Sequence, residues 1–409
     1  MQTSIWEDKF ADRTKKITSS AIRELLKMAS RPEVISFGGG MPAPELFPRQ
    51  EILAACERVL NNPDMAYQAL QYSTTEGYGP LREWIAEFMS KDGLIVNPDN
   101  ILITGGSQQA LDMIGKVFIN EGDHVVVESP TYLGALQAWA PYGARYATVP
   151  SDENGMDPEG MENALKNNPR FIYALPNFQN PTGVSISLPR RQKIVELSTQ
   201  FGIPLVEDDP YGALTFEGEP LPALIALENQ YQHPSKSENS NVLYLSTFSK
   251  ILTPGLRLAW MVAPSRVIGK MVQAKQGMDL HTNTFSQYVA YEVARTGFLK
   301  GHIERIKEVY RHRRDVMIEC LEENLPQGKG ISWTHPRGGL FLWVTLPPQI
   351  DSARVLERAI TENVAFVPGE SFHPGGGGQN TMRLNFSYSP DEKICEGISR
   401  LGKVLKQMV

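Results

Sequence analysis

The chain has 409 residues, of which 41% are hydrophobic and 21% charged, so it is long enough for two or more packed regions and too apolar for a disordered protein. Its net charge of −6, from 40 basic and 46 acidic residues, excludes the basic field that binds nucleic acid or an anionic membrane. We therefore expect small-molecule partners, with no nucleic acid and no membrane among them.

The N-terminal stretch MQTSIWEDKFADRTKK is polar, and no later segment offers about 18 consecutive apolar residues. The three cysteines, Cys56, Cys320 and Cys395, form no C-x-x-C pair, which argues against a disulfide framework and against a cysteine zinc site. The seven histidines show no metal-ligand spacing. The sequence predicts a cytoplasmic protein without a catalytic metal.

The first predicted elements are a helix over 19–29, with an apolar face, and an extended Pro-rich segment over 37–48. Short apolar runs then alternate with turns and helical periodicity, the pattern of βαβ units. The predicted strands are 101–104, 124–128, 171–175, 203–207, 241–246 and 257–262. Because these runs are apolar throughout, they predict a mostly parallel sheet buried on both faces, and so an α/β fold.

A long charged helix is predicted over about 298–324, and strands within 338–347, 363–369 and 381–388 follow it. The segment HPGGGGQ, 373–379, is expected to be a flexible loop, because no strand leads into it. The predicted division is an N-terminal arm over 1–50 that joins the small domain, a large domain over 51–305 and a small α+β domain over 306–409.

Unusual side chains follow five of the predicted strands. The exits read GGSQQ, SPTYLG, PNFQNPTG, DDPYG and STFSK. Ligands of open α/β sheets bind outside the carboxyl ends of the strands. Each residue alone has a structural reading: Asp208 could cap a helix, Tyr132 could pack, and Lys250 could be a surface lysine. Their concurrence at strand ends favours a functional site.

Three of these motifs, NPTG at 180–183, EDDPYG at 207–212 and STFSKILTPGLR at 246–257, resemble the fold-type I pyridoxal-phosphate (PLP) aminotransferases. Likeness to the 2-aminoadipate/kynurenine aminotransferase II group extends over nearly the whole chain, through SSAIRELLKMASRPEVISFGGGMPAPELFP, LQYSTTEGYGPLR, ITGGSQQALDMIGKVF, AKQGMDLHT and NVAFVPG. The resemblance implies a large domain with a mostly parallel sheet and a smaller α+β domain.

The resemblance also implies roles around the cofactor, pyridoxal 5′-phosphate. Lys250 would hold it covalently and then carry a proton, for which its pKa must fall below the usual value of about 10.4. Asp208 would face the pyridine nitrogen, and Asn180 and Tyr211 would bond the 3′ oxygen, while Tyr132 stacks on the ring. The implied phosphate ligands are Ser107, Gln108, Thr247, Ser249 and Arg257.

Tyr72 would reach the phosphate of a neighbouring subunit, which implies a homodimer. Arg383 matches the arginine that binds the substrate α-carboxylate, because a guanidinium fixes the plane of a carboxylate. Arg23 matches the arginine that binds a distal carboxylate, although a solvent-facing helix arginine is the equally weighted alternative. Further implied substrate-binding residues are Asn180, Ser20, Gly39 and Gly40.

The implied reaction moves the amino group of an L-amino acid, first of all 2-aminoadipate and also glutamate, to a 2-oxo acid such as 2-oxoglutarate in two ping-pong half-reactions. One alternative is an aromatic or branched-chain aminotransferase. A PLP-dependent β-lyase is another, but the sequence context of the lyases is absent. A transcription regulator with an aminotransferase-like domain is the third, and such regulators carry an N-terminal DNA-binding domain, for which the residues before Ser19 leave no room.

Overall fold

The computed structural model describes residues 5–17, 31, 33–90, 94–231 and 240–408. Its largest feature is an eight-stranded sheet in the order β2-β9-β8-β7-β6-β3-β4-β5. The five strands from β8 to β4 run parallel, whereas β2, β9 and β5 pair antiparallel with their neighbours. The strands are β2 (Ile101–Thr104), β3 (His124–Ser129), β4 (Arg145–Asp152), β5 (Gly155–Met156), β6 (Phe171–Ala174), β7 (Leu205–Asp208), β8 (Val242–Thr247) and β9 (Ala259–Val262).

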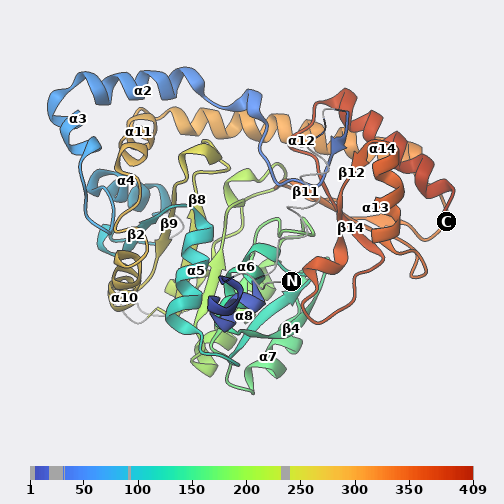
Figure 1. Ribbon diagram of the computed structural model, residues 1–409, viewed down its shortest axis with the longest axis horizontal. Helices are drawn as coiled ribbons and strands as arrows, with labels where there is room; N and C mark the ends of the chain where they lie inside the picture. Colours follow the sequence, from blue (N-terminus) through green and yellow to red (C-terminus); the bar gives the residue numbers. More distant parts are fainter. Residues whose placement is uncertain (1–4, 18–30, 32, 91–93, 232–239, 409) are drawn as a thin grey trace.

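Helices cover both faces of this sheet (Figure 1). One face packs on α5 (Ser107–Phe118), α6 (Leu133–Trp139) and α10 (Ser265–Gln276). The other packs on α4 (Gly79–Met89), α7 (Pro158–Leu165), α8 (Leu188–Phe201), α9 (Leu224–Tyr231) and α11 (Thr284–Ala294). Along β6, Phe171 and Tyr173 join the first layer, while Ile172 and Ala174 join the second. This alternation explains why the central strands are apolar throughout.

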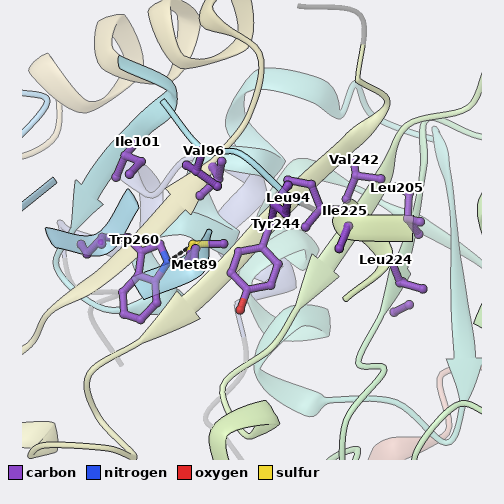
Figure 2. Close-up of a cluster of buried hydrophobic side chains, with 14 of the residues drawn as sticks. Met89, Leu94, Val96, Ile101, Leu205, Leu224, Ile225, Val242, Tyr244 and Trp260 are labelled. Atoms are coloured by element: carbon purple, nitrogen blue, oxygen red, sulfur yellow. Dashed lines mark hydrogen bonds between the residues drawn. The ribbon is translucent and has the colours of Figure 1, made fainter. Parts of the chain in front are cut away.

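Figure 2 shows part of the second layer, where strands and loops far apart in sequence meet. The indole Nε1 of Trp260 on β9 donates to Sδ of Met89, the last residue of α4, at 3.1 Å. Leu205, Val242 and Tyr244 project from neighbouring strands into the same cluster. The packing holds the sheet rigid beneath the ends of β6, β7 and β8.

A second core lies in the C-terminal part of the chain. The sheet β10-β11-β14-β13 is antiparallel. Its elements are β10 (Ser332–Trp333), β11 (Phe341–Thr345), β13 (Val367–Pro368) and β14 (Thr381–Asn385), with α13 (Ser352–Thr361) and α14 (Asp391–Lys406) packed beside them. The long α12 (Phe298–Asn324) joins the two cores, since Leu299 belongs to the first and Ile306 to the second (Figure 1). The domain boundary at 305/306 stays a prediction.

Segments near the N-terminus pack on both cores. The short helix η1 (Glu7–Lys9) is followed by η2 (Asp12–Lys16), which packs on η5 (Ala140–Tyr142), and Lys16 Nζ is 2.6 Å from Glu121 Oε1. In contrast, β1 (Ile35–Ser36) pairs in parallel with β12 (Val364–Ala365) of the C-terminal core. Next come α2 (Arg49–Asn61) and α3 (Pro63–Leu70), both packed on α11. The predicted helix over 19–29 lies outside the described residues.

The disulfide and an unpredicted pair of strands differ from the sequence expectations. Cys320 and Cys395 form a disulfide with Cα atoms 5.5 Å apart, so the expectation against disulfides is wrong for this pair. The reason is tertiary, because α12 and α14 pack side by side and bring together cysteines 75 residues apart. The strands β4 and β5 were not predicted, because β4 is largely solvent-accessible and lacks an apolar run.

None of the helices in the described parts of the chain is both long and apolar enough to cross a membrane. Nor do those residues contain three His, Cys, Asp or Glu side chains grouped to hold a metal ion. The cytoplasmic location stays a prediction.

Candidate active site

Lys250, in the turn that follows β8, lies at the centre of the candidate site. Its Nζ donates to the carbonyl oxygen of Gly40 at 2.8 Å. Burial and, to a smaller extent, the positive charges of Arg383 and Arg257 together lower the pKa of Lys250 to about 8. A larger fraction of this amine is therefore neutral near neutral pH than of an ordinary lysine, which makes it available as a nucleophile and base.

Asp208 is the last residue of β7, and its two carboxylate oxygens have different surroundings. Oδ2 accepts a hydrogen bond from the Tyr173 hydroxyl at 2.8 Å. Oδ1 is buried and has no hydrogen-bond partner among the described residues. Burial raises the pKa of Asp208 to about 7, and the bond from Tyr173 opposes that rise. A buried carboxylate with a bare oxygen is an acceptor that lacks its donor.

Asn180 and Tyr211 reach the same place from two other strand exits. The Asn180 amide oxygen accepts from Arg383 Nη1 at 2.6 Å. A side-chain hydrogen bond also couples Asn180 to Tyr211, although burial raises the pKa of that phenol far above its usual range. Tyr211 therefore stays protonated at neutral pH and acts as a hydrogen-bond donor.

Arg383, on β14, brings the C-terminal core into the site. Nη2 donates to the Gly38 carbonyl oxygen at 2.7 Å, while Nε is buried without a partner among the described residues. The guanidinium lies 4.3 Å from the Phe341 ring centroid and 5.2 Å from that of Phe372. Burial lowers the pKa of Arg383 to about 10, so the group remains cationic at neutral pH. It is a fixed, planar cation with a free donor.

A backbone cradle lies between β2 and α5. Gly106, with φ of +100°, turns the chain so that α5 begins at Ser107. A Cβ on Gly106 would lie 2.4 Å from Arg257 Nη2, so only glycine lets the guanidinium approach this turn. Ser107 Oγ is buried and has no partner within the described residues. A helix N-terminus, an unpaired hydroxyl and a guanidinium together fit a phosphate.

Thr247 and Ser249 border the cradle through the turn after β8. Thr247 Oγ1 accepts from the Ser249 backbone nitrogen at 3.0 Å and bonds the Ser249 hydroxyl at 2.9 Å. Gln108 has an exposed side chain that donates to the Gly134 carbonyl at 2.9 Å, so only its backbone N–H is directed by the helix start. The hydroxyls and amides that the sequence predicted as phosphate ligands thus belong to neighbouring turns.

Tyr132, at the start of α6, is positioned by a glycine. A Cβ on Gly134 would lie 2.4 Å from Cζ of the Tyr132 ring, so the ring needs glycine at that position. Burial raises the pKa of the Tyr132 hydroxyl, and the charges of Asp208, Arg383 and Arg257 also act on it, so the phenol is within electrostatic range of these groups. It is available to stack on a planar ligand bound there.

Tyr72 lies at the surface, unlike the buried residues of the site described above. It is 78% exposed, and its ring centroid lies 5.8 Å from that of His281. Gly39 is buried next to Gly40 and supplies no side chain to the site. Ser20 and Arg23 lie outside the described residues.

The described residues fit PLP by their unpaired donors and acceptors. Asp208 Oδ1 offers an acceptor for a protonated ring nitrogen, and Ser107 Oγ offers a donor beside the phosphate cradle. Lys250 offers an amine of lowered pKa. These three positions match the pyridine nitrogen, the phosphate and the aldehyde of one PLP molecule in chemical type.

Sequence reasoning missed several supporting residues. Tyr173 has the only polar side-chain atom in the predicted strand FIYAL, and this could have identified it as a candidate. Phe341 and Phe372 gave no signal, because they resemble ordinary core residues. Behind the cradle, the buried Lys275 bonds Asp279 at 2.7 Å and Gln109 at 3.2 Å, and Gln109 accepts from the Gly105 backbone nitrogen.

Comparisons with known proteins agree with this geometry. The family model described as aminotransferase class I and II matches residues 50–401. A 2-aminoadipate transaminase of Thermus thermophilus is 44% identical over 410 residues, covering 100% of this chain and 99% of the relative. An aromatic-amino-acid aminotransferase of Thermococcus litoralis is 44% identical, covering 98% and 95%. The crystal structure of α-aminoadipate aminotransferase from Thermus thermophilus with N-(5′-phosphopyridoxyl)-L-leucine has a TM-score of 0.91, 43% identity and 99% coverage of both chains.

Proposed function

The chain belongs to the aminotransferase class I and II family and is an aminotransferase, and on this premise we propose that it transfers the amino group of L-2-aminoadipate to 2-oxoglutarate with PLP as cofactor. The observation that carries the proposal is the concurrence of Lys250, Asp208 Oδ1 and Arg383 in one buried site. The name of the Thermus thermophilus relative supports 2-aminoadipate as the donor.

When bound, PLP supplies an electron sink that stabilises negative charge at the α-carbon of the amino acid. Lys250 would hold the cofactor through Nζ, and the same amine, when free and neutral, would accept and return the proton of the substrate α-carbon. The lowered pKa of Lys250 supports this role, because only the neutral amine can accept that proton. Gly40 directs Nζ through its carbonyl oxygen.

Asp208 holds a proton on the ring nitrogen through Oδ1, since a carboxylate next to that nitrogen favours its protonated form. Asn180 and Tyr211 donate to the 3′ oxygen, and Tyr132 stacks on the ring. Ser107 and Gln108 backbone amides, with the side chains of Thr247, Ser249 and Arg257, bind the phosphate. These roles are supported by the unpaired atoms Asp208 Oδ1 and Ser107 Oγ and by the start of α5 at Ser107.

Arg383 binds the α-carboxylate of the substrate. Asn180 and Gly38 each hold one terminal nitrogen of the guanidinium, which leaves Nε as a free donor. Flanking contacts with Phe341 and Phe372 restrict the guanidinium plane. The substrate α-carbon would then be fixed within reach of Lys250, and Gly39 and Gly40 leave room beside it for the substrate side chain.

We also infer a homodimer in which Tyr72 reaches the phosphate of the neighbouring subunit. Apolar side chains are exposed along α2 and α3, at an outer edge of the molecule (Figure 1). They are Leu53, Leu60, Tyr67 and Leu70. An exposed apolar face of this kind favours a protein interface, and the exposure of Tyr72 beside it supports a role across that interface.

The substrate assignment depends on Arg23 and Ser20, which we propose as ligands of the distal carboxylate. An aromatic amino acid is the second candidate donor, because the Thermococcus litoralis relative at 44% identity carries an aromatic-amino-acid aminotransferase name. To distinguish these donors, a measurement must compare amino acids that differ at the distal end of the side chain.

The test is the single-turnover decay of the bound-cofactor absorbance, with 2-aminoadipate, glutamate, kynurenine, phenylalanine and leucine in separate reactions. We expect the fastest decay with 2-aminoadipate, and Arg23→Ala should slow that reaction far more than the one with leucine. Arg13→Ala, a change of an exposed arginine on η2, is the matched control. Faster decay with phenylalanine would replace the donor, and no cofactor band would refute the whole proposal.

A further inference from the structure

The unequal surroundings of the two Asp208 oxygens follow from the register of the sheet. Tyr173 on β6 is paired with Val206 on β7, and Asp208 lies two residues beyond Val206. Since side chains alternate along a strand, Tyr173 and Asp208 project from the same face of the sheet. The phenol consequently reaches Oδ2 at 2.8 Å and leaves Oδ1 bare.

The phenol itself is held in place by the elements that carry the phosphate cradle. Tyr173 is fully buried, and its ring meets the Trp139 ring edge-on, with centroids 5.1 Å apart. Trp139 Nε1 donates to the Leu111 carbonyl on α5 at 2.8 Å. Because α5 begins at Ser107, the same helix fixes both the phosphate cradle and, through Trp139, the position of the phenol.

Tyr173 can only act as a donor toward Asp208. Burial and the neighbouring Asp208 charge raise the pKa of the phenol far above its usual value, so it keeps its proton at working pH. Other ionisable groups around Asp208 are Asp209, Tyr132 and Tyr211, of which Asp209 opposes ionisation of the carboxyl. The phenol hydrogen bond is therefore the described contact that favours the carboxylate form.

We propose that Tyr173 is a positioning residue that, by bonding Oδ2, fixes the rotation of the Asp208 carboxylate and directs Oδ1 at the ring nitrogen of the cofactor. The inference rests on the proposed PLP-dependent function and adds to it a residue that touches neither substrate nor cofactor. If the Tyr173 hydroxyl only stabilised the fold, any acceptor would satisfy it. Its removal would then leave the pH dependence of PLP binding, which reports on Asp208, unchanged.

The test compares Tyr173→Phe, which removes only the hydroxyl, with Tyr146→Phe. Tyr146 is the matched control, because its hydroxyl also donates one bond of 3.0 Å, but to the Leu136 backbone carbonyl. Dissociation constants of PLP are measured by titrating each cofactor-free protein between pH 6 and 9, alongside kcat and KM. Thermal melts verify that each variant is folded.

In Tyr173→Phe we expect the PLP dissociation constant at pH 7 to rise about tenfold, the range for one hydrogen bond to a charged group. The defect should shrink toward pH 9, because the carboxyl of the variant loses its proton at higher pH than that of the wild type. kcat should fall about tenfold while KM changes less than about twofold. Equal behaviour of the Tyr173 and Tyr146 variants overturns the inference.

A double-mutant cycle with Asp208→Asn separates action through Asp208 from any general effect. In the Asp208→Asn background, Tyr173→Phe should cause little further loss of PLP affinity. A fully additive loss would overturn the positioning role. If wild-type protein neither binds PLP nor transfers amino groups, the proposed function itself fails, whereas an active wild type with an unaffected Tyr173→Phe variant refutes only this inference.

Discussion

Replacing Arg383 by lysine tests the proposed α-carboxylate site most directly. The guanidinium is buried, makes hydrogen bonds of 2.6 and 2.7 Å to Asn180 and Gly38, and lies 4.3 and 5.2 Å from the ring centroids of Phe341 and Phe372. An ammonium keeps the charge but cannot present two parallel donors to a carboxylate. The variant loses one bond to the substrate and the ordering contact with Asn180, at about 1.5 kcal/mol each. The sum of about 3 kcal/mol corresponds to a loss of roughly 150-fold in kcat/KM.

The assay measures the rate of cofactor absorbance decay against amino acid concentration for the wild type and Arg383→Lys. We expect the loss to appear mainly in the apparent substrate affinity, with the absorbance spectrum of the bound cofactor unchanged. The control is an amine that corresponds to the substrate without its α-carboxylate. It should react slowly, at nearly the same rate with both proteins. A loss below fivefold, or an equal loss with the amine, would refute the role of Arg383.

The remaining predictions concern the cofactor and the C-terminal core. In cofactor-free protein, PLP attachment to Lys250 should quicken about tenfold per pH unit up to about pH 8 and then level off, because only the neutral amine reacts; a rate rising to pH 10 in stopped-flow absorbance would contradict the lowered pKa. Gly134→Ala should displace the Tyr132 ring and raise the PLP dissociation constant about three- to tenfold without lowering the melting temperature; unchanged affinity by fluorescence titration would exclude the stacking role. Thiol titration should find Cys320 and Cys395 protected until reduction, and reduction should destabilise the protein by about 2–4 kcal/mol in urea unfolding. Three reactive thiols in the native protein would show that this bridge is absent.

Local patterns predicted those elements whose residues carry their own signal. The run ILIT forms β2 over the predicted residues 101–104, and α12 spans the predicted 298–324. The apolar run and the helical period suffice there, because each element is buried or amphipathic along its whole length. β4 escaped prediction because it is largely solvent-accessible, so hydrogen bonds to β3 rather than an apolar run define it.

The sequence by itself determined the family, through motifs in which the order and type of residues are specific, and it predicted the site residues by that resemblance. Only the tertiary structure decided which of their atoms are paired. Tyr173 reaches Asp208 through the register of β6 and β7, and Cys320 reaches Cys395 through the packing of α12 on α14. Neither contact has a local signature, because each joins residues far apart in the chain whose approach depends on the packing of whole elements.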